Sequence, residues 1–495
     1  MRTPVFAIAL HGLLSLTALS GSQGLRAEAP PNVLLILVDD LNDWVGFLGG
    51  HPQVKTPHLD RLAARGVVFT NAHCQAPLCN PSRTSFMLGL RPTTTGVYGL
   101  SPWFRDVPAL KDRVPLPRYF AAHGYHTLAT GKVFHRHFGL RDGDREFAEV
   151  GPRYDDGPFP PRRLSRVPGS WGKGNDWGPT QDRDEDRGDW KLTSWAIERL
   201  RGAVPKPFFM AVGIRLPHVP LFAPEEWFDL YPEHRVTLPE LRRDDRNDTP
   251  RFSWYLHWRL PEHRLIQLDL AGENRHQVRA YLACVSFMDA QVGRLMETLE
   301  QTGLSRNTIV VVASDHGWHL GEKEITGKNT LWEPSTRVPF LFAGPGIGRR
   351  LQCREPVELL DLYPTLVELC GLPRRPELEG LSLLPQLQDP AHPRPRPALT
   401  TANPGNHALR SQEWRYIRYA DGSEELYHLE TDPHEWTNLA TTRLYQDVLA
   451  QHRRWLPRNE ADFAPGSRGR TLEVRHGQVF WEGALIEPDA PIPGF

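Results

Sequence analysis

Three short runs of consecutive apolar residues stand out along the chain. They cover residues 32–38, 207–212 and 308–313, and they are rich in β-branched side chains. Continuous apolar runs of this length are typical of strands buried on both faces of a parallel sheet. The pattern therefore predicts three central strands of one sheet.

Between these runs, apolar residues recur with a helical period. One face of a predicted helix carries a set of seven such residues: Tyr281, Cys284, Val285, Met288, Val292, Leu295 and Leu299. Residues 357–369 have a similar pattern, with Pro364 as an interruption. Strands that alternate with helices predict an α/β fold with a mostly parallel, doubly wound sheet.

The hydrophobic pattern changes towards the C-terminus. The chain is rich in proline from 373 to 397, and then two strand-like runs, 414–419 and 425–429, flank Asp421-Gly422. Asp-Gly between two such runs is a hairpin signal. We therefore expect a catalytic domain over 30–385 and a smaller subdomain with an antiparallel sheet over 386–495.

The N-terminus has the features of a secretory signal peptide. Arg2 precedes an apolar stretch over 5–19, and small residues suited to cleavage follow before residue 30. A membrane anchor is the alternative, although about 15 residues is short for a span. We expect residues 1–29 to be removed, no stable membrane insertion afterwards, and a periplasmic or extracellular protein.

Composition narrows the function only slightly. The 495 residues are 40% hydrophobic and 24% charged, with a formal net charge of −1. Bulk charge therefore does not favour a nucleic-acid partner. The five cysteines are too few for a disulfide scaffold; Cys353 with Cys370 is one conceivable pair, and Cys284 on its apolar helical face is expected to be buried.

The segment Cys79-Asn80-Pro81-Ser82-Arg83 is the strongest candidate for chemistry. Pro81 suits a first helical turn, so Cys79 is expected at a helix N-terminus, where backbone N–H groups favour anions. Arg83 adds a planar cation suited to oxyanions. These surroundings fit an inert buried thiol, a reactive thiolate or a modified residue, and the segment alone does not choose among them.

Acidic residues follow two of the predicted strands. Asp39 and Asp40 end the first, and Asp315 and His316 end the run at 308–313. Each pair alone is equally compatible with a cap or a solvated surface. If the strands are parallel, their carboxyl ends meet at one edge of the sheet. Three carboxylates and one histidine favour Ca²⁺ or Mg²⁺, and the histidine leaves a transition metal open.

Further basic residues lie near the ends of other predicted elements. They are Lys132 and His135 after Gly131, His218 between two prolines, and Lys328. In isolation Lys132 is more often a surface charge, and His218 is equally consistent with a structural role.

Taken together, these motifs resemble the type I sulfatases. The family carries an Asp-Asp pair, a Cys-x-Pro-Ser-Arg signature, a Gly-Lys-x-x-His block, a Pro-His pair, an Asp-Asn or Asp-His pair and a downstream lysine. The chain has all six in that order, and the resemblance extends from about Asn32 to about Asn438. It implies the alkaline-phosphatase-like sulfatase fold and sulfuric ester hydrolysis.

Details of the motifs resemble the iduronate-2-sulfatase branch and its bacterial relatives. His316 stands where the commoner arylsulfatase form has asparagine. The chain departs from that branch at Arg215 and Leu216, where iduronate-2-sulfatase has histidine and lysine. This departure leaves the identity of the sulfated sugar open.

The resemblance also implies roles for individual residues. A divalent cation, Ca²⁺ by preference, would be held by Asp39, Asp40, Asp315, His316 and residue 79. A maturase would oxidise Cys79 to Cα-formylglycine, whose hydrate attacks sulfur. Catalytic or substrate-binding roles fall to the remaining candidates: Arg83, Lys132, His135, Arg215, His218, Trp318 and Lys328.

Two of these assignments have alternatives. His218 is the preferred general acid because imidazole titrates near neutral pH, and Lys328 competes for that role. Trp318 and the aromatic residues of the 227–275 segment either stack on a sugar ring or belong to the core. Segments 137–188 and 227–275 are expected to be irregular, and either line the pocket or lie at the periphery.

Three other functions stay open at this point. The nearest is a phosphate or phosphonate monoester hydrolase of the same superfamily, some of which use formylglycine. The second is a non-catalytic protein that binds sulfated glycans, which is disfavoured because every motif position is filled. The third is a plain cysteine hydrolase, which would not need the acidic cluster.

Overall fold

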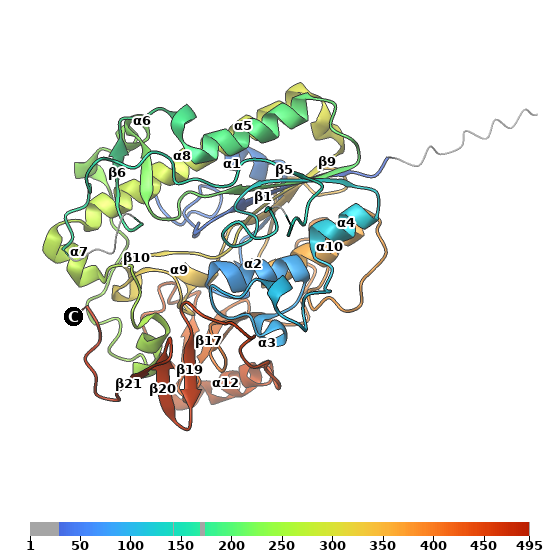
Figure 1. Ribbon diagram of the computed structural model, residues 1–495. Helices are drawn as coiled ribbons and strands as arrows, with labels where there is room; N and C mark the ends of the chain where they lie inside the picture. Colours follow the sequence, from blue (N-terminus) through green and yellow to red (C-terminus); the bar gives the residue numbers. More distant parts are fainter. Residues whose placement is uncertain (1–28, 142, 169–173, 495) are drawn as a thin grey trace, which may run out of the picture.

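An eight-stranded sheet forms the centre of the molecule in the computed structural model, which describes residues 29–141, 143–168 and 174–494 (Figure 1). The strand order is β13-β2-β12-β9-β1-β7-β4-β5. Neighbours are parallel except where β12 pairs with β9 and β2. The strands are β1 (Asn32–Val38), β2 (Gly66–Phe69), β4 (His126–Gly131), β5 (Glu149–Val150), β7 (Phe208–Ile214), β9 (Thr308–Ser314), β12 (Phe340–Ala343) and β13 (Leu351–Cys353).

The three predicted central strands are confirmed as β1, β7 and β9, which are adjacent and parallel. Their side chains are buried along their whole length. In β1, alternate residues enter two different cores: Leu34, Ile36 and Val38 enter one, and the intervening residues enter the other. A strand buried on both faces needs no polar face, which explains its unbroken apolar sequence.

Helices cover both faces of the sheet, as the doubly wound prediction requires (Figure 1). The long helix α8 (Asn274–Gln301) packs on one face together with α5 (Gly188–Arg201) and α1 (Pro57–Ala63). The opposite face carries α2 (Cys79–Leu88), α4 (Leu116–Ala122) and α10 (Leu362–Leu369). The predicted apolar face of residues 281–299 is confirmed within α8.

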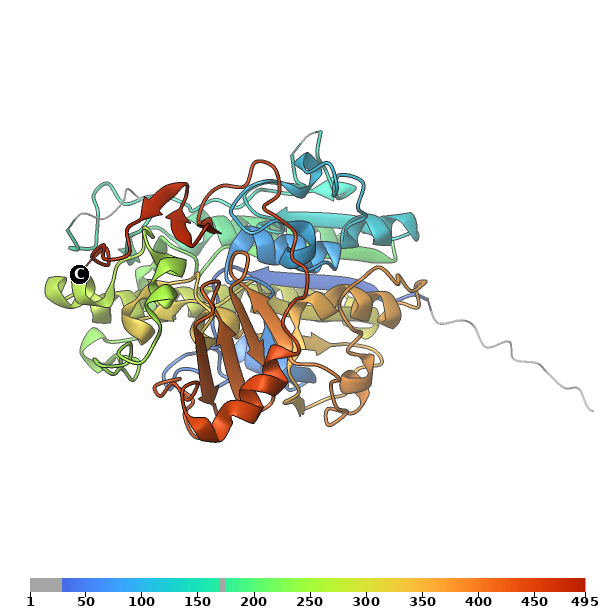
Figure 2. The same ribbon diagram turned by 90° about the horizontal axis from the view of Figure 1, so that it is seen from below.

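The C-terminal part forms a separate antiparallel sheet, β15-β16-β17-β18, with α12 (Gln446–Arg453) beside it (Figure 2). Its strands are β15 (Ala398–Thr401), β16 (His407–Arg410), β17 (Trp414–Arg418) and β18 (Glu424–His428). The predicted hairpin is therefore confirmed, and Gly422 has the positive φ of 93° that its turn requires. A last three-stranded sheet follows, formed by β19 (Leu472–Arg475), β20 (Gln478–Trp481) and β21 (Ala484–Ile486).

The remaining elements are short and connect these layers. The strands are β3 (Ala72–His73), β6 (Trp177–Thr180), β8 (Leu221–Pro224), β10 (His319–Leu320), β11 (Thr326–Gly327) and β14 (Val357–Glu358). The helices are α3 (Pro92–Thr95), α6 (Glu225–Asp229), α7 (Leu265–Ala271), α9 (Glu333–Thr336) and α11 (Leu384–Gln388).

Two expectations from the sequence are wrong. Residues 357–369 are not one helix: a short strand and a 3₁₀ turn precede α10, so Pro364 falls in the first turn, where its missing N–H is tolerated. Cys353 and Cys370 are not paired, and all five cysteines are free, buried thiols.

The aromatic residues Trp254, Tyr255 and Trp258 are buried. Tyr255 and Trp258 pack against the C-terminal subdomain in one core cluster with Leu331 and Tyr427. They are therefore core residues rather than an exposed stacking surface. Residues 1–28 of the predicted signal peptide lie outside the described residues. No helix among the described residues is long and apolar enough to cross a membrane.

Candidate active site

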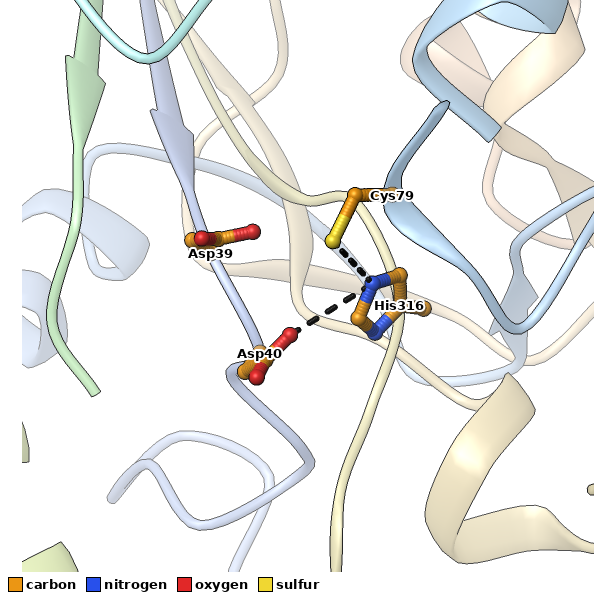
Figure 3. Close-up of side chains that lie close together, drawn as sticks. All are labelled: Asp39, Asp40, Cys79 and His316. Carbon is orange, nitrogen blue, oxygen red and sulfur yellow. Dashed lines mark hydrogen bonds and ion pairs between the residues drawn. The ribbon is translucent and has the colours of Figure 1, made fainter. Parts of the chain in front are cut away.

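The acidic residues meet Cys79 at the carboxyl ends of the central strands (Figure 3). Asp39 and Asp40 follow β1 and His316 follows β9, while Cys79 begins α2. Ligand atoms of these four side chains all lie within 4.8 Å of one another, and all four residues are buried. The sequence prediction that the two acidic segments meet at one sheet edge is confirmed.

This cluster fits a hard divalent cation. Asp40 Oδ2 is buried without a hydrogen-bond partner, which is costly for a carboxylate oxygen unless a cation satisfies it. Burial raises the pKa of Asp40 to about 7, although Lys328 opposes that shift. The carboxylate oxygens match the donor preference of Ca²⁺ or Mg²⁺, whereas the imidazole nitrogen of His316 also suits a transition metal.

Two lysines from distant segments converge on Cys79. Lys132 Nζ lies 3.5 Å from Cys79 Sγ and also bonds Asp39, whereas Lys328 Nζ lies 3.2 Å from Sγ and 2.6 Å from Asp40 Oδ1. Burial raises the pKa of the Cys79 thiol, but Lys132, Lys328 and His316 outweigh it and hold that pKa well below its usual range. The position therefore stabilises a negative charge at residue 79.

Arg83 is fully buried and bonds residues that follow three strands of the central sheet, β1, β4 and β9. Its Nε donates to Asp315 Oδ2 at 2.8 Å, and its Nη2 lies 3.4 Å from Asp39 Oδ1. Its Nη1 donates to the backbone carbonyls of Lys132 and Val133. Asp315, which the resemblance assigns to the metal, is thus paired with Arg83 and is not one of the four clustered side chains.

Three histidines lie in or beside this cluster. His316 Nε2 lies 3.2 Å from Cys79 Sγ and 3.4 Å from Asp40 Oδ1 (Figure 3). Burial lowers the pKa of His135 to about 4, although the neighbouring Cys79 opposes that shift. His218 Nε2 lies 3.8 Å from Asp40 Oδ2. Burial, with Arg215 and Lys328, lowers the pKa of His218 well below its ordinary value, so His218 is neutral before substrate arrives.

Two predicted substrate-binding residues have other partners in the structure. Arg215 donates to Asp156 Oδ1 at 2.8 Å and to Asp39 Oδ2 at 3.2 Å. The Trp318 side chain is only 1% exposed and belongs to the core that includes α8. The core interpretation of Trp318 is therefore favoured; its ring lies 5.5 Å from Lys328 Nζ and supports that lysine.

The geometry agrees with the comparisons to known proteins. The Sulfatase family matches residues 31–372, and the family of the N-sulphoglucosamine sulphohydrolase C-terminal region matches residues 321–462. The chain belongs to the sulfatase family. It is therefore a sulfatase enzyme with the sulfatase fold.

Similarity to individual sulfatases extends over nearly the whole chain. A sulfatase of Formosa agariphila is 39% identical over 93% of both chains. Mouse (Mus musculus) iduronate 2-sulfatase is 29% identical over 86% of this chain and 93% of its own. A solved structure of a 2-O GAG sulfatase matches with a TM-score of 0.68 and 25% identity, over 86% of this chain and 90% of its own.

The fold is shared beyond the sulfatases. The solved phosphonate monoester hydrolase from Silicibacter pomeroyi has a TM-score of 0.72 at 21% identity, over 92% of this chain and 99% of its own. This likeness concerns the fold alone.

The structure adds residues that sequence reasoning missed. The Tyr154 ring lies 5.9 Å from Lys132 Nζ and 5.2 Å from the Arg215 guanidinium carbon. Asp189 accepts hydrogen bonds from the backbone N–H groups of Arg215 and Leu216 and so fixes the loop that carries His218. The only signal for Tyr154 was its place in the irregular 137–188 segment, and Asp189 gave none.

Proposed function

We propose that this sulfatase removes sulfate from a sulfated sugar or glycan, using residue 79 after its conversion to formylglycine. The observation that carries the proposal is the position of Cys79 at the α2 N-terminus, between two lysines and the Asp39–Asp40 pair. The named activities of relatives support the substrate class, because they include iduronate 2-sulfatase and a 2-O GAG sulfatase.

Burial of Cys79 bears on when the modification takes place. The residue is 1% exposed and enclosed by Lys132, Lys328 and His316. A maturase cannot reach it in the folded chain, so oxidation precedes folding. One hydroxyl of the aldehyde hydrate would attack sulfur and displace the sugar alcohol, which takes up a proton. Deprotonation of the second hydroxyl would then break the C–O bond to the sulfate, restore the aldehyde and release sulfate.

The remaining residues have distinct roles in this proposal. Asp39, Asp40 and His316, with residue 79, would hold the cation, Ca²⁺ by preference and Mg²⁺ as the alternative. The bound cation would withdraw charge from sulfate oxygens. Lys132 and His135 orient residue 79 and its hydroxyls. Arg83 fixes Asp39, Asp315 and the Lys132 carbonyl, so it positions the other groups. Asp315 is paired with Arg83 and is not one of the four clustered side chains.

Lys328 and His218 lie on the leaving-group side in this proposal. Asp40 and Cys79 raise the pKa of Lys328 against the effect of burial, so its ammonium stays charged and stabilises the sulfate. His218 is neutral before substrate arrives, so it acts as general acid only when an incoming anion favours its protonated form.

The chain departs from iduronate-2-sulfatase at the loop that carries Arg215 and Leu216, and this leaves the identity of the sulfated sugar open. Arg215 is committed to Asp156 and Asp39, and Leu216 is buried in the core. This loop therefore offers no free cation to the sugar, and recognition of the sugar falls to other segments.

For the domain organisation and the export of the protein, our proposal keeps the sequence prediction. We infer that residues 1–29 are a cleaved signal peptide and that the mature enzyme acts in the periplasm or outside the cell. The division into 30–385 and 386–495 accords with the two separate sheets.

The reaction is tested with an aryl sulfate and the matching aryl phosphate. We expect a clear preference for the sulfate, and loss of turnover by at least about a thousandfold in Cys79→Ala, since the nucleophile is removed. Cys284→Ala, a buried thiol in α8 away from the site, is the matched control and keeps its activity. A preference for the phosphate would contradict the proposed reaction.

A further inference from the structure

The C-terminal segment returns to the active-site side of the molecule. After α12 it runs past α2, as Figure 2 shows, and is fixed there by backbone hydrogen bonds. Ala464 N donates to Gly96 O at 2.8 Å, and Leu100 N donates to Gly469 O at 3.0 Å. Residues more than 360 positions apart in sequence are thus adjacent in space.

The loop over residues 99–102 connects this segment to Cys79. Asn80 Nδ2, one residue after Cys79, donates to Gly99 O and Pro102 O, each at 3.0 Å. The chain at 468–470 packs on the other side of that loop, where Ser101 and Arg468 form a bridge. Only the loop over residues 99–102 therefore separates the segment that carries Arg470 from the segment that carries Cys79.

A second path leads from Arg470 to the site. Arg470 Nη2 donates to Glu262 Oε1 at 2.6 Å. The side chain of Glu262 lies against Gly327, where an added Cβ would come within 2.8 Å of it. Gly327 directly precedes Lys328, whose Nζ contacts Cys79 Sγ. Two independent sets of contacts therefore place Arg470 beside the site.

The guanidinium of Arg470 keeps one nitrogen without a hydrogen-bond partner. Its Nη1 is buried and has no hydrogen-bond partner, whereas its side chain as a whole keeps 12% exposure. A buried donor without a partner is rare, because losing water without a replacement bond is costly. The backbone is held firmly, since Arg470 N donates to Glu482 Oε1 at 2.6 Å and its carbonyl accepts from Asn403.

We propose that Arg470 is a specificity-determining residue that binds a second anionic group of the substrate, close to the sulfate that is cleaved. This inference rests on the proposed function. The chemistry required is an oxyanion that accepts from a guanidinium edge, which both a sugar carboxylate and a second sulfate ester provide. Burial lowers the pKa of Arg470, but Glu262, with smaller contributions from Cys79 and Asp40, outweighs it, so that pKa is raised and the guanidinium stays charged.

Arg470 supplies the cation that Arg215 cannot offer to the substrate, because the Arg215 guanidinium is paired with Asp156 and Asp39. The loop at 215–216 presents no free cation, but the C-terminal segment supplies one from another direction. The enzyme thus takes part of its substrate recognition from a region outside the central sheet.

The test compares Arg470→Ala with wild type on four sulfate esters: nitrophenyl sulfate, a neutral monosulfated sugar, a sulfated uronate disaccharide and a disulfated hexosamine. We expect kcat/KM to fall roughly tenfold or more on a substrate that carries a second anionic group. It should stay within about twofold on nitrophenyl sulfate and the monosulfated neutral sugar, which carry no anion besides the sulfate ester. Loss confined to the uronate identifies the carboxylate, and loss confined to the hexosamine identifies the sulfate.

Two controls separate recognition from folding. Arg468→Ala changes an exposed arginine in the same turn and leaves all four rates unchanged. Arg470→Lys keeps the charge and recovers part of the lost rate. An equal fall on all four substrates, or no fall, would contradict the inference while leaving the sulfatase reaction intact. A wild-type enzyme inactive on every sulfate ester would contradict the proposed function and the inference with it.

Discussion

At the scale of single residues, one arginine holds the charged groups of the site together. Arg83 has no exposed surface, and its guanidinium reaches Asp315, Asp39 and two backbone carbonyls. Buried charges are tolerated only when each has partners. Removal of Arg83 leaves Asp315 without its main counter-charge and takes one partner from Asp39, which keeps Lys132 and Arg215.

Arg83→Met is therefore expected to be strongly destabilising. The free energy of unfolding should fall by about 3–5 kcal/mol, because two buried carboxylates lose a partner. Urea denaturation measures the change. The matched control is Arg65→Met, which breaks an exposed pair with Glu300 and should cost less than about 1 kcal/mol. Equal effects of the two substitutions would show that Arg83 does not organise the site.

The cation cluster leads to a second prediction at this scale. A chelator should abolish turnover and lower the melting temperature by several degrees, because a ligand that binds only the native state stabilises it. Added Ca²⁺ should restore both. In Asp40→Asn the melting temperature should no longer respond to the chelator. A chelator response that persists in this variant would place the cation elsewhere.

At the scale of elements, close contact between β4 and β7 positions Lys132. A Cβ added to Gly213 would lie 2.2 Å from the carbonyl carbon of Lys132, and one added to Gly131 would lie 2.0 Å from Gly213 O. Gly131 also has a positive φ of 75°. The strands approach this closely only because both positions lack side chains.

Gly213→Ala should force the ends of β4 and β7 apart. We expect activity to fall by at least about tenfold, since Lys132 and the carbonyl that Arg83 contacts are displaced, and we expect lower stability through overpacking. The measurements are kcat/KM and the melting temperature. Gly202→Ala, at the exposed end of α5, is the control and should have little effect on either. Normal activity in Gly213→Ala would contradict the positioning role of this contact.

Elements with a single dominant signal were predictable from sequence. The unbroken apolar runs of β1, β7 and β9 and the Asp421-Gly422 hairpin each allow one interpretation. The pattern of residues 357–369 allows two interpretations, because its apolar spacing suits one long helix and also a strand and turn before a short helix. Cys79, Lys132 and Lys328 were found through ordered motifs. Tyr154, Asp189 and Arg470 were not, since their roles depend on contacts between segments far apart in sequence.

At the scale of the whole molecule, Glu358 joins the α2 side of the core to the C-terminal sheet. It pairs with Arg91 at 2.6 Å and Arg396 at 3.0 Å, and it accepts from the Leu399 backbone N–H in β15. Burial alone would raise the pKa of Glu358, but Arg91 and Arg396 outweigh it and lower that pKa to about 2.

This carboxylate predicts a pH dependence of stability. A folded pKa below the unfolded one contributes stability above the unfolded pKa of about 4.3, and the contribution is lost as pH falls towards 2. Glu358→Gln should therefore lose on the order of 3 kcal/mol at neutral pH and show a flatter acid limb in urea denaturation. Glu430→Gln, an exposed position, is the control. Parallel acid limbs for wild type and Glu358→Gln would contradict this role.

The central claim is that residue 79 acts as formylglycine and not as cysteine. The most direct measurement is a mass spectrum of the peptide that contains residue 79, from protein made in its native host. We expect a peptide lighter by the difference between a thiol side chain and an aldehyde, together with its hydrate. An intact, alkylatable thiol at residue 79 in active enzyme would contradict it.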